Sequence, residues 1–293
     1  MVIVITGPTA VGKTKMSVEL AKRLNGEIIN ADSTQVFKEL NIATAKIKEE
    51  EKENIIHHLF DIKEINENYT VYDYQKDARI LIEDILKRGK VPILVGGTGL
   101  YIKACLYDYK FDDEIKINEY EELTNEEIYN KLINIDKDIN IHINNRKRLV
   151  RSLNYYESTG KLFSEKEKTD KILYDTIFIG LTTDRDILYD RINKRVDVMV
   201  EEGLLEEAKN IYDSNIRTKA IMTPIGYKEL FPYFENKKTK EECLDLIKQN
   251  SRKYAKRQYT WFKNQMNINW FDVDFNNFNN TIDEVYNYIK KNY

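Results

Sequence analysis

GPTAVGKT, residues 7–14, follows the apolar run Val2–Ile5 after a single residue, Thr6. These eight residues fit G-x-x-x-x-G-K-[ST], the pattern of a phosphate-binding loop between a strand and a helix. In such a loop the backbone N–H groups point at phosphate oxygens, the lysine adds a positive charge and the next hydroxyl binds Mg²⁺. The pattern predicts phosphate binding without saying which phosphate compound is bound. The expected phosphate-binding residues are Gly7, Pro8, Thr9, Ala10, Val11, Gly12, Lys13 and Thr14, with Thr14 as the magnesium ligand.

The composition limits the class of protein. Of the 293 residues 32% are charged, and the formal net charge is only -3, so any surface that binds nucleic acid must be local. No apolar stretch approaches the roughly 18 residues of a membrane span, and the N-terminus does not resemble a secretion signal. Cys105 and Cys243 lie far apart, which suits a reducing compartment. We therefore expect a cytoplasmic protein with both cysteines buried. Separately from the composition, we expect a monomer.

Short runs of β-branched residues predict strands, and segments of helical period lie between them. This alternation predicts an α/β fold, a P-loop kinase-like core in which helices flank a parallel sheet on both faces. The predicted strands are Val2–Ile5, Glu27–Asn30, Val91–Val95, Thr176–Leu181 and Ile268–Val273.

The pattern changes between about Asp112 and Lys171, where Glu, Lys, Asn and Ile are frequent and no strand is evident. We interpret this stretch as a helical insertion domain. The expected organisation is therefore 1–111 for the first part of the core, 112–172 for the insertion and 173–293 for the second part. The Asn-rich segment Asn276–Asn280 is expected to be a polar connector before a final helix, with no assigned function.

Two further stretches follow predicted strands. In ADSTQVF, residues 31–37, Asp32 could accept a proton, hold the water shell of a metal, or cap a helix. In VGGTGLYIKA, residues 95–104, three glycines let the backbone approach a ligand and Thr98 offers a hydroxyl, although this could also be an ordinary loop. Ligands of open α/β sheets bind at the carboxyl ends of strands, so these stretches and the phosphate loop together predict a site there.

Local basic clusters supply the positive charge that the whole chain lacks. One lies within residues 146–151, and the other, within 252–257, is interleaved with Tyr254, Tyr259 and Trp261. Such surfaces bind phosphates and stack bases, but either cluster alone could be a solvated helix face. Arg191 and Arg195 share a helix face and could close over a polyphosphate as a lid.

The three histidines do not form a metal-binding pattern. His57 and His58 are adjacent and so point in different directions on a regular element, while His142 is remote in sequence. We expect all three to be structural.

Taken together and in order, eight segments resemble the tRNA dimethylallyltransferase (tRNA isopentenyltransferase) family and span nearly the whole chain. The resemblance implies transfer of a dimethylallyl group from dimethylallyl diphosphate to N6 of the adenosine 3′-adjacent to a tRNA anticodon, with Mg²⁺. The segments are GPTAVGKT, ADSTQVF, ATAK (43–46), HHLFDI (57–62), VGGTGLYIKA, RINKRVDVMVEEGL (191–204), IGYKEL (225–230) and YAKRQYTWF (254–262).

The resemblance also implies roles for single residues. Asp32 would take the N6 proton, and Thr98 would help to place the nucleophile. The residues implied in contact with the anticodon stem-loop are Asp32, Ser33, Thr34, Gln35, Thr98, Arg148, Arg151, Lys256 and Arg257. The chain departs from the family pattern at Ala43, Ile47, Asn145, Asn154 and Thr223, which bears on tRNA selectivity and efficiency more than on reaction type.

Two other functions use the same features. A small-molecule P-loop kinase would place ATP on the same loop and under the same arginines, but it leaves the basic aromatic segment without a task. A catalytically inactive RNA-binding relative would not need Lys13, Thr14, Asp32 and Thr98 intact.

Overall fold

The computed structural model describes residues 1–111, 118–165 and 171–292. The chain divides into two compact units, Met1–Tyr107 with Ile172–Tyr293, and Asp108–Lys171. The expected first boundary, at residue 112, lies in 112–117, outside the described residues. The chain returns to the larger unit at Ile172, the last residue of the expected insertion.

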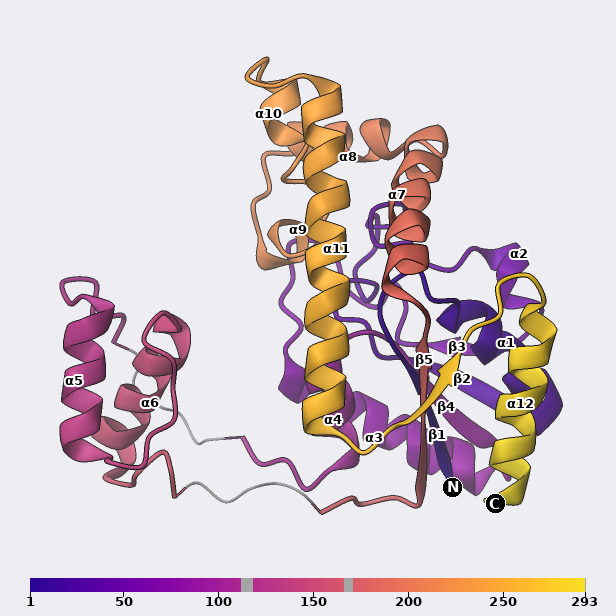
Figure 1. Ribbon diagram of the computed structural model, residues 1–293, viewed down its shortest axis with the longest axis horizontal. Helices are drawn as coiled ribbons and strands as arrows, with labels where there is room; N and C mark the ends of the chain where they lie inside the picture. Colours follow the sequence, from indigo (N-terminus) through magenta and orange to yellow (C-terminus); the bar gives the residue numbers. More distant parts are fainter. Residues whose placement is uncertain (112–117, 166–170, 293) are drawn as a thin grey trace. The chain divides into compact units, whose positions relative to one another are not determined.

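A parallel sheet of six strands forms the centre of the larger unit (Figure 1). All five predicted strands are present, and the predicted α/β class is confirmed. The sixth strand, β3, was missed because two residues are too short to show a period. In spatial order the strands are β3 (His57–His58), β2 (Gly26–Asn30), β4 (Val91–Val95), β1 (Val2–Thr6), β5 (Thr176–Thr182) and β6 (Asn269–Asp272).

Successive residues of a strand point to opposite faces of the sheet. Because both sets of residues are apolar in the central strands, helices cover both faces. Ile3 and Ile5 of β1 pack in one core with residues of α1 and α12. Val2 and Val4 pack in the other with residues of α3, α4 and α11. The helices of the larger unit are α1 (Lys13–Leu24), α2 (Glu49–Lys52), α3 (Val71–Lys87), α4 (Gly99–Leu106), α7 (Arg185–Glu201), α8 (Leu204–Asp213), α9 (Lys219–Met222), α10 (Phe231–Phe234), α11 (Lys240–Gln265) and α12 (Phe278–Lys291).

A third apolar cluster lies beyond the sheet and holds α7 to α11 together. Its members include Val196 of α7, Leu204 of α8 and Ile247 of α11, together with Val36 and Leu40 from the segment after β2. The long helix α11 contributes to all three cores, through Ile247 here and through Ala255 and Phe262 in the two cores beside the sheet (Figure 1). It thereby fixes the α7–α10 region to the sheet.

The smaller unit is helical in its described residues, as expected. It contains α5 (Asn125–Ile135) and α6 (Arg146–Thr159), packed around buried Leu132, Leu149 and Leu153. Both asparagines that depart from the family pattern have structural contacts here. Asn145 caps α6 by accepting from the Arg148 N–H, and buried Asn154 accepts from the Asn118 N–H.

Within the parts of the chain that the structure describes, no helix has the length and apolar character to cross a membrane. Cys105 and Cys243 are both buried and free, as expected.

Candidate active site

The phosphate loop lies between β1 and α1, where the motif predicted it. Gly7 and Gly12 have φ angles of +137° and +101°, which side chains other than glycine rarely adopt. A Cβ on Gly7 would stand 2.4 Å from the Leu181 carbonyl oxygen of β5. Glycine is therefore required at Gly7 by both conformation and space.

Lys13 begins α1 and turns back over the loop. Its Nζ donates to the carbonyl oxygens of Gly7 at 3.0 Å and Pro8 at 2.8 Å. Burial, with the nearby charge of Arg195, lowers the pKa of Lys13 to about 8, and Asp32 partly opposes this shift. Lys13 therefore remains mostly protonated at neutral pH and is a cation with little water around it.

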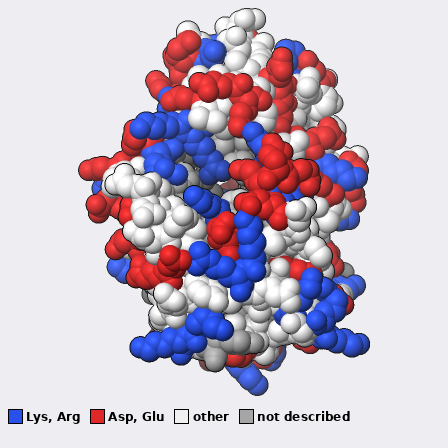
Figure 2. Space-filling model, turned by 90° about the vertical axis from the view of Figure 1, so that its right-hand side faces the viewer, with Lys and Arg blue, Asp and Glu red and all other residues white. Residues whose placement is uncertain are grey.

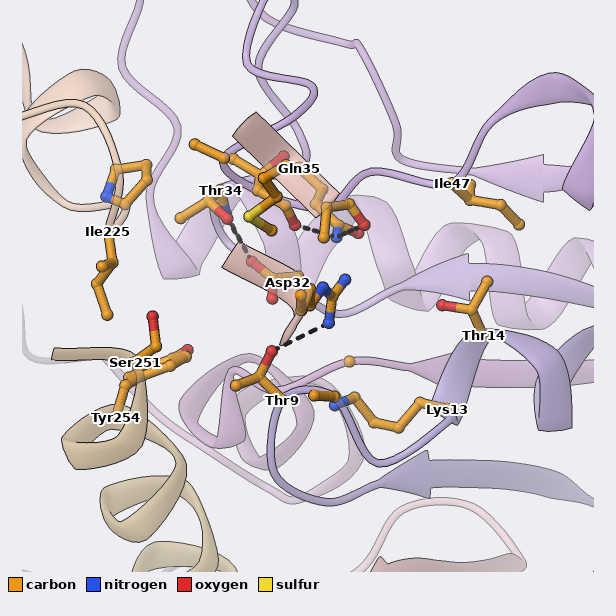
Figure 3. Close-up of a pocket in the computed structure, with 18 of the residues that line it drawn as sticks. Thr9, Lys13, Thr14, Asp32, Thr34, Gln35, Ile47, Ile225, Ser251 and Tyr254 are labelled. Carbon is orange, nitrogen blue, oxygen red and sulfur yellow. Dashed lines mark hydrogen bonds between the residues drawn. The ribbon is translucent and has the colours of Figure 1, made fainter. Parts of the chain in front are cut away.

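Arg191 and Arg195 reach the phosphate loop from one face of α7, as their spacing predicted. Arg191 Nε donates to the Ala10 carbonyl at 3.1 Å. Arg195 Nη1 donates to Thr9 Oγ1 at 3.3 Å, the bond drawn to Thr9 in Figure 3. Burial lowers the pKa of both guanidinium groups, but arginine stays charged near neutrality. Three cations thus surround one short loop.

The Asp32 carboxylate lies at the carboxyl end of β2 in a turn. Its Oδ1 accepts from the Thr34 N–H at 3.0 Å and from Thr34 Oγ1 at 2.7 Å (Figure 3). The next helix in the chain begins only at Glu49, so the alternative of a helix cap is wrong. The turn fixes one carboxylate oxygen, while Oδ2 lies on the side of Gly97.

Thr98 is brought to Asp32 through Ser33. Its Oγ1 accepts from the Ser33 N–H at 3.0 Å and donates to Ser33 Oγ at 3.3 Å. The two loops touch through their backbones, since a Cβ on Gly96 would stand 2.2 Å from the Ala31 carbonyl. The β2 and β4 loops, separate in sequence, thus form one surface.

Gln35 and Glu207 hold the segment that contains the ATAK motif. Gln35 Nε2 donates to the Thr44 carbonyl at 2.9 Å. The Glu207 carboxylate of α8 accepts from the backbone N–H groups of residues 41–43 and from the Tyr227 hydroxyl. Sequence reasoning missed Glu207, because a single acidic residue on a charged helix carries no signal.

A cleft of about 1080 Å³ joins these parts. Figure 2 shows a hollow on one face of the molecule, with basic side chains on one side of its rim and acidic ones on the other. Figure 3 shows Thr9, Lys13 and Thr14 on one wall, Asp32, Thr34 and Gln35 on another, and Tyr254 of α11 nearby. The predicted residues that line the cleft are Thr9, Ala10, Gly12, Lys13, Thr14, Asp32, Ser33, Thr34, Gln35, Arg191, Arg195 and Arg257.

The other predicted residues lie elsewhere. Thr98 contacts the cleft through Ser33, and Lys256 is exposed on α11 next to Arg257. Arg148 and Arg151 belong to the smaller unit, where both are exposed on α6. Tyr254 and Gln258 line the cleft although the sequence did not single them out as site residues.

A magnesium ion would find few protein ligands here. Among the described residues no group of three or more His, Cys, Asp or Glu side chains could hold a metal. His58 pairs with Glu27, and His57 Nδ1 contacts the Ile55 carbonyl, so both histidines have structural contacts. The exposed Thr14 hydroxyl on the cleft wall fits Mg²⁺, which takes most of its ligands from phosphate and water.

The fold and the cleft define a P-loop protein of the α/β class in which three cations, Lys13, Arg191 and Arg195, lie around the loop. The model of the IPP transferase family matches residues 35–265. The chain belongs to the IPP transferase family.

Known relatives match almost the entire chain. It is 51% identical to the tRNA dimethylallyltransferase of Anoxybacillus flavithermus, over 99% of this chain and 96% of the relative. A tRNA isopentenylpyrophosphate transferase from Bacillus halodurans shares the fold with a TM-score of 0.77 at 45% identity, covering 99% and 95% of the two chains. A eukaryotic dimethylallyltransferase acting on tRNA has a TM-score of 0.80 at 35% identity, covering 92% and 73%.

Proposed function

We propose that this protein transfers a dimethylallyl group from dimethylallyl diphosphate to N6 of the adenosine 3′-adjacent to a tRNA anticodon. The family membership supports this reaction over a small-molecule kinase. The main structural support is that the phosphate loop and Asp32 line one cleft, close enough for Asp32 to raise the pKa of Lys13. One site can therefore hold both a leaving diphosphate and a proton acceptor.

The leaving group determines the difficulty of the reaction. The N6 amine is a poor nucleophile because its lone pair is delocalised into the adenine ring, so the allylic C–O bond must be weakened. The backbone N–H groups of the loop, Lys13, Arg191 and Arg195 would spread the charge of the departing diphosphate. Mg²⁺, held by Thr14 and the diphosphate, would add a Lewis acid when bound.

The acceptor side uses the turn after β2. Asp32 is oriented through Thr34, and it would take the proton as N6 bonds to the allylic carbon. The C–O bond breaks as the C–N bond forms, and diphosphate leaves. An adenine stacked in an anticodon loop cannot reach such a cleft, so the base must be extruded.

The RNA would be held at several places. Ser33, Thr34 and Gln35 line the cleft with Asp32, and Arg257 lies on its wall beside exposed Lys256. Arg148 and Arg151 offer positive charge on the smaller unit. We assign these residues to the anticodon stem-loop, whose unpaired bases can be splayed and whose phosphates attract cations. We further propose that the protein acts as a cytoplasmic monomer.

In the direct test, purified protein is incubated with Mg²⁺, dimethylallyl diphosphate and an anticodon stem-loop RNA, and the RNA is then analysed by mass spectrometry. The mass of the RNA should increase by that of one dimethylallyl group, and digestion should locate this group on the adenosine 3′ of the anticodon. An RNA of unchanged mass would refute it.

Thermal stabilisation separates this reaction from the kinase. With Mg²⁺, dimethylallyl diphosphate or diphosphate should raise the melting temperature more than ATP does, because a ligand stabilises the state that binds it. Greater stabilisation by ATP would favour the kinase. An RNA-binding protein without catalysis would bind the stem-loop and leave its mass unchanged.

A further inference from the structure

Gln258 of α11 connects two parts of the site that come from opposite ends of the sequence. Its Oε1 accepts from the Thr9 N–H of the phosphate loop at 2.9 Å. Its Nε2 donates to the Gly97 carbonyl of the β4 loop at 3.1 Å. The side chain is 5% exposed, so both bonds are made away from bulk water. A buried amide that joins two loops strongly restrains the distance between them.

The Gln258 side chain is closely packed against its neighbours. A Cβ on Gly97 would stand 2.0 Å from Gln258 Nε2, and that same Cβ would lie 3.9 Å from Asp32 Oδ2. Burial, with the nearby charge of Asp32, raises the pKa of Tyr254, one turn earlier on α11, and the nearby side chains of Gln258 and Thr98 partly oppose this shift. Gln258 is therefore adjacent to the residues of the acceptor side while it holds the loop of the donor side.

The chemistry requires an amide at this position. One partner is an N–H donor and the other is a carbonyl acceptor, so the side chain must accept at one atom and donate at the other. Glutamate keeps the acceptor but puts an acidic oxygen against the Gly97 carbonyl. Methionine has a similar length and offers neither strong bond.

We propose that Gln258 is a positioning residue that sets the phosphate loop at the correct distance from Asp32 and Thr98. This inference rests on the proposed prenyl transfer. The leaving diphosphate would be anchored at the loop and the adenine amine at Asp32, so the loop spacing sets the separation of the reacting atoms. A misplacement of about 1 Å can cost on the order of 100-fold in rate.

The experiment compares Gln258→Met and Gln258→Glu with Gln249→Met, a control on an exposed position of the same helix. Single-turnover prenylation is measured at saturating dimethylallyl diphosphate and stem-loop RNA. We expect both Gln258 variants to lose about 10- to 100-fold in rate, and the control to stay within about twofold. The affinity of each variant for the RNA alone should stay within about threefold, since the RNA-contacting side chains are intact.

Amide hydrogen exchange provides a readout that does not depend on the reaction. In Gln258→Met both the 7–14 and 96–99 segments should exchange faster than in wild type, because each loses its link, whereas β2 should not change. If the wild-type protein does not prenylate RNA, the proposed function is refuted. Hydrogen exchange then still tests whether Gln258 holds the two loops together. A rate within twofold of wild type in Gln258→Met, or unchanged exchange in both segments, would overturn the positioning role. If Gln258→Met does not fold, Gln258→Glu carries both measurements.

Discussion

The guanidinium carbon of Arg191 lies 3.8 Å from the centre of the Phe275 ring. Arg191 also donates to the Ala10 carbonyl, so the ring and the phosphate loop hold the guanidinium from two directions. Phe278 follows closely and lies against Gly12, where a Cβ would stand 2.6 Å from the ring. The segment after β6 therefore supports the phosphate loop, although it lies outside residues 35–265 of the family match. The expected connector Asn276–Asn280 does precede a final helix, but it is shorter than expected because α12 already begins at Phe278.

Replacing Phe275 should weaken binding of the diphosphate donor. A cation–π contact is worth about 0.5–2 kcal/mol, so Phe275→Leu should raise the dissociation constant of dimethylallyl diphosphate roughly 2- to 30-fold. Phe275→Tyr keeps an aromatic face and should bind nearly as wild type does. Calorimetry in the Arg191→Met background tests whether Phe275 acts through Arg191, since Phe275→Leu should not raise the dissociation constant further in that background. An equal loss in both backgrounds would contradict action through Arg191.

Donor affinity should fall at alkaline pH. The pKa of Lys13 is lowered to about 8 by burial and Arg195, so the ligand-free protein loses this positive charge as the pH rises through 8. An anionic ligand binds the protonated form better, and the affinity should fall by up to about tenfold per pH unit above 8. Calorimetry from pH 7 to 9.5 measures this. Lys13→Arg, which stays charged, should show no such fall, and a flat wild-type profile would exclude Lys13 as the titrating group.

The same lysine should cost the folded protein stability. Because its pKa is lowered from 10.5 to about 8, the unfolded chain holds a proton between these values that the folded protein lacks. The penalty is fully present below pH 8 and disappears as the pH approaches 10.5. Lys13→Met should therefore raise the free energy of unfolding by on the order of 1–3 kcal/mol at pH 7, less the loss of two hydrogen bonds. Urea titration of both proteins at pH 7 and 10 should show the difference shrinking, and a constant difference would contradict the assignment.

Asp32→Asn separates the chemistry of Asp32 from its structural contact. The amide oxygen can still accept from Thr34, so the turn should keep its shape. The proton acceptor is lost, and turnover should fall about 10²- to 10⁴-fold. RNA affinity, measured by filter binding, should stay within a few fold. Turnover close to wild type would remove Asp32 from the reaction.

The sequence predicted the sheet well because its strands are buried on both faces, which leaves continuous apolar runs such as Val91–Val95. It predicted the phosphate loop because glycine spacing reflects a local backbone conformation. Gln258 gave no signal, since its partners lie 249 and 161 residues away and a lone glutamine among lysines and arginines suggests a solvated face. Phe275 was also missed, because the asparagines that follow it suggested a loop and its partner Arg191 is distant in sequence.

The two ends of the insertion join the larger unit at adjacent points, so the length of the insertion does not affect the sheet. Tyr107 and Ile172 pair as an antiparallel bridge, and the Leu173 N–H donates to the Leu106 carbonyl at 2.8 Å. The chain thus leaves and re-enters the core at adjacent points, as it would for a hairpin turn. Evolution can lengthen, shorten or exchange the intervening segment without shifting β5 in its register beside β1. Under the proposed function, RNA preference can then diversify in a module of its own while the proposed catalytic site of the larger unit is inherited unchanged.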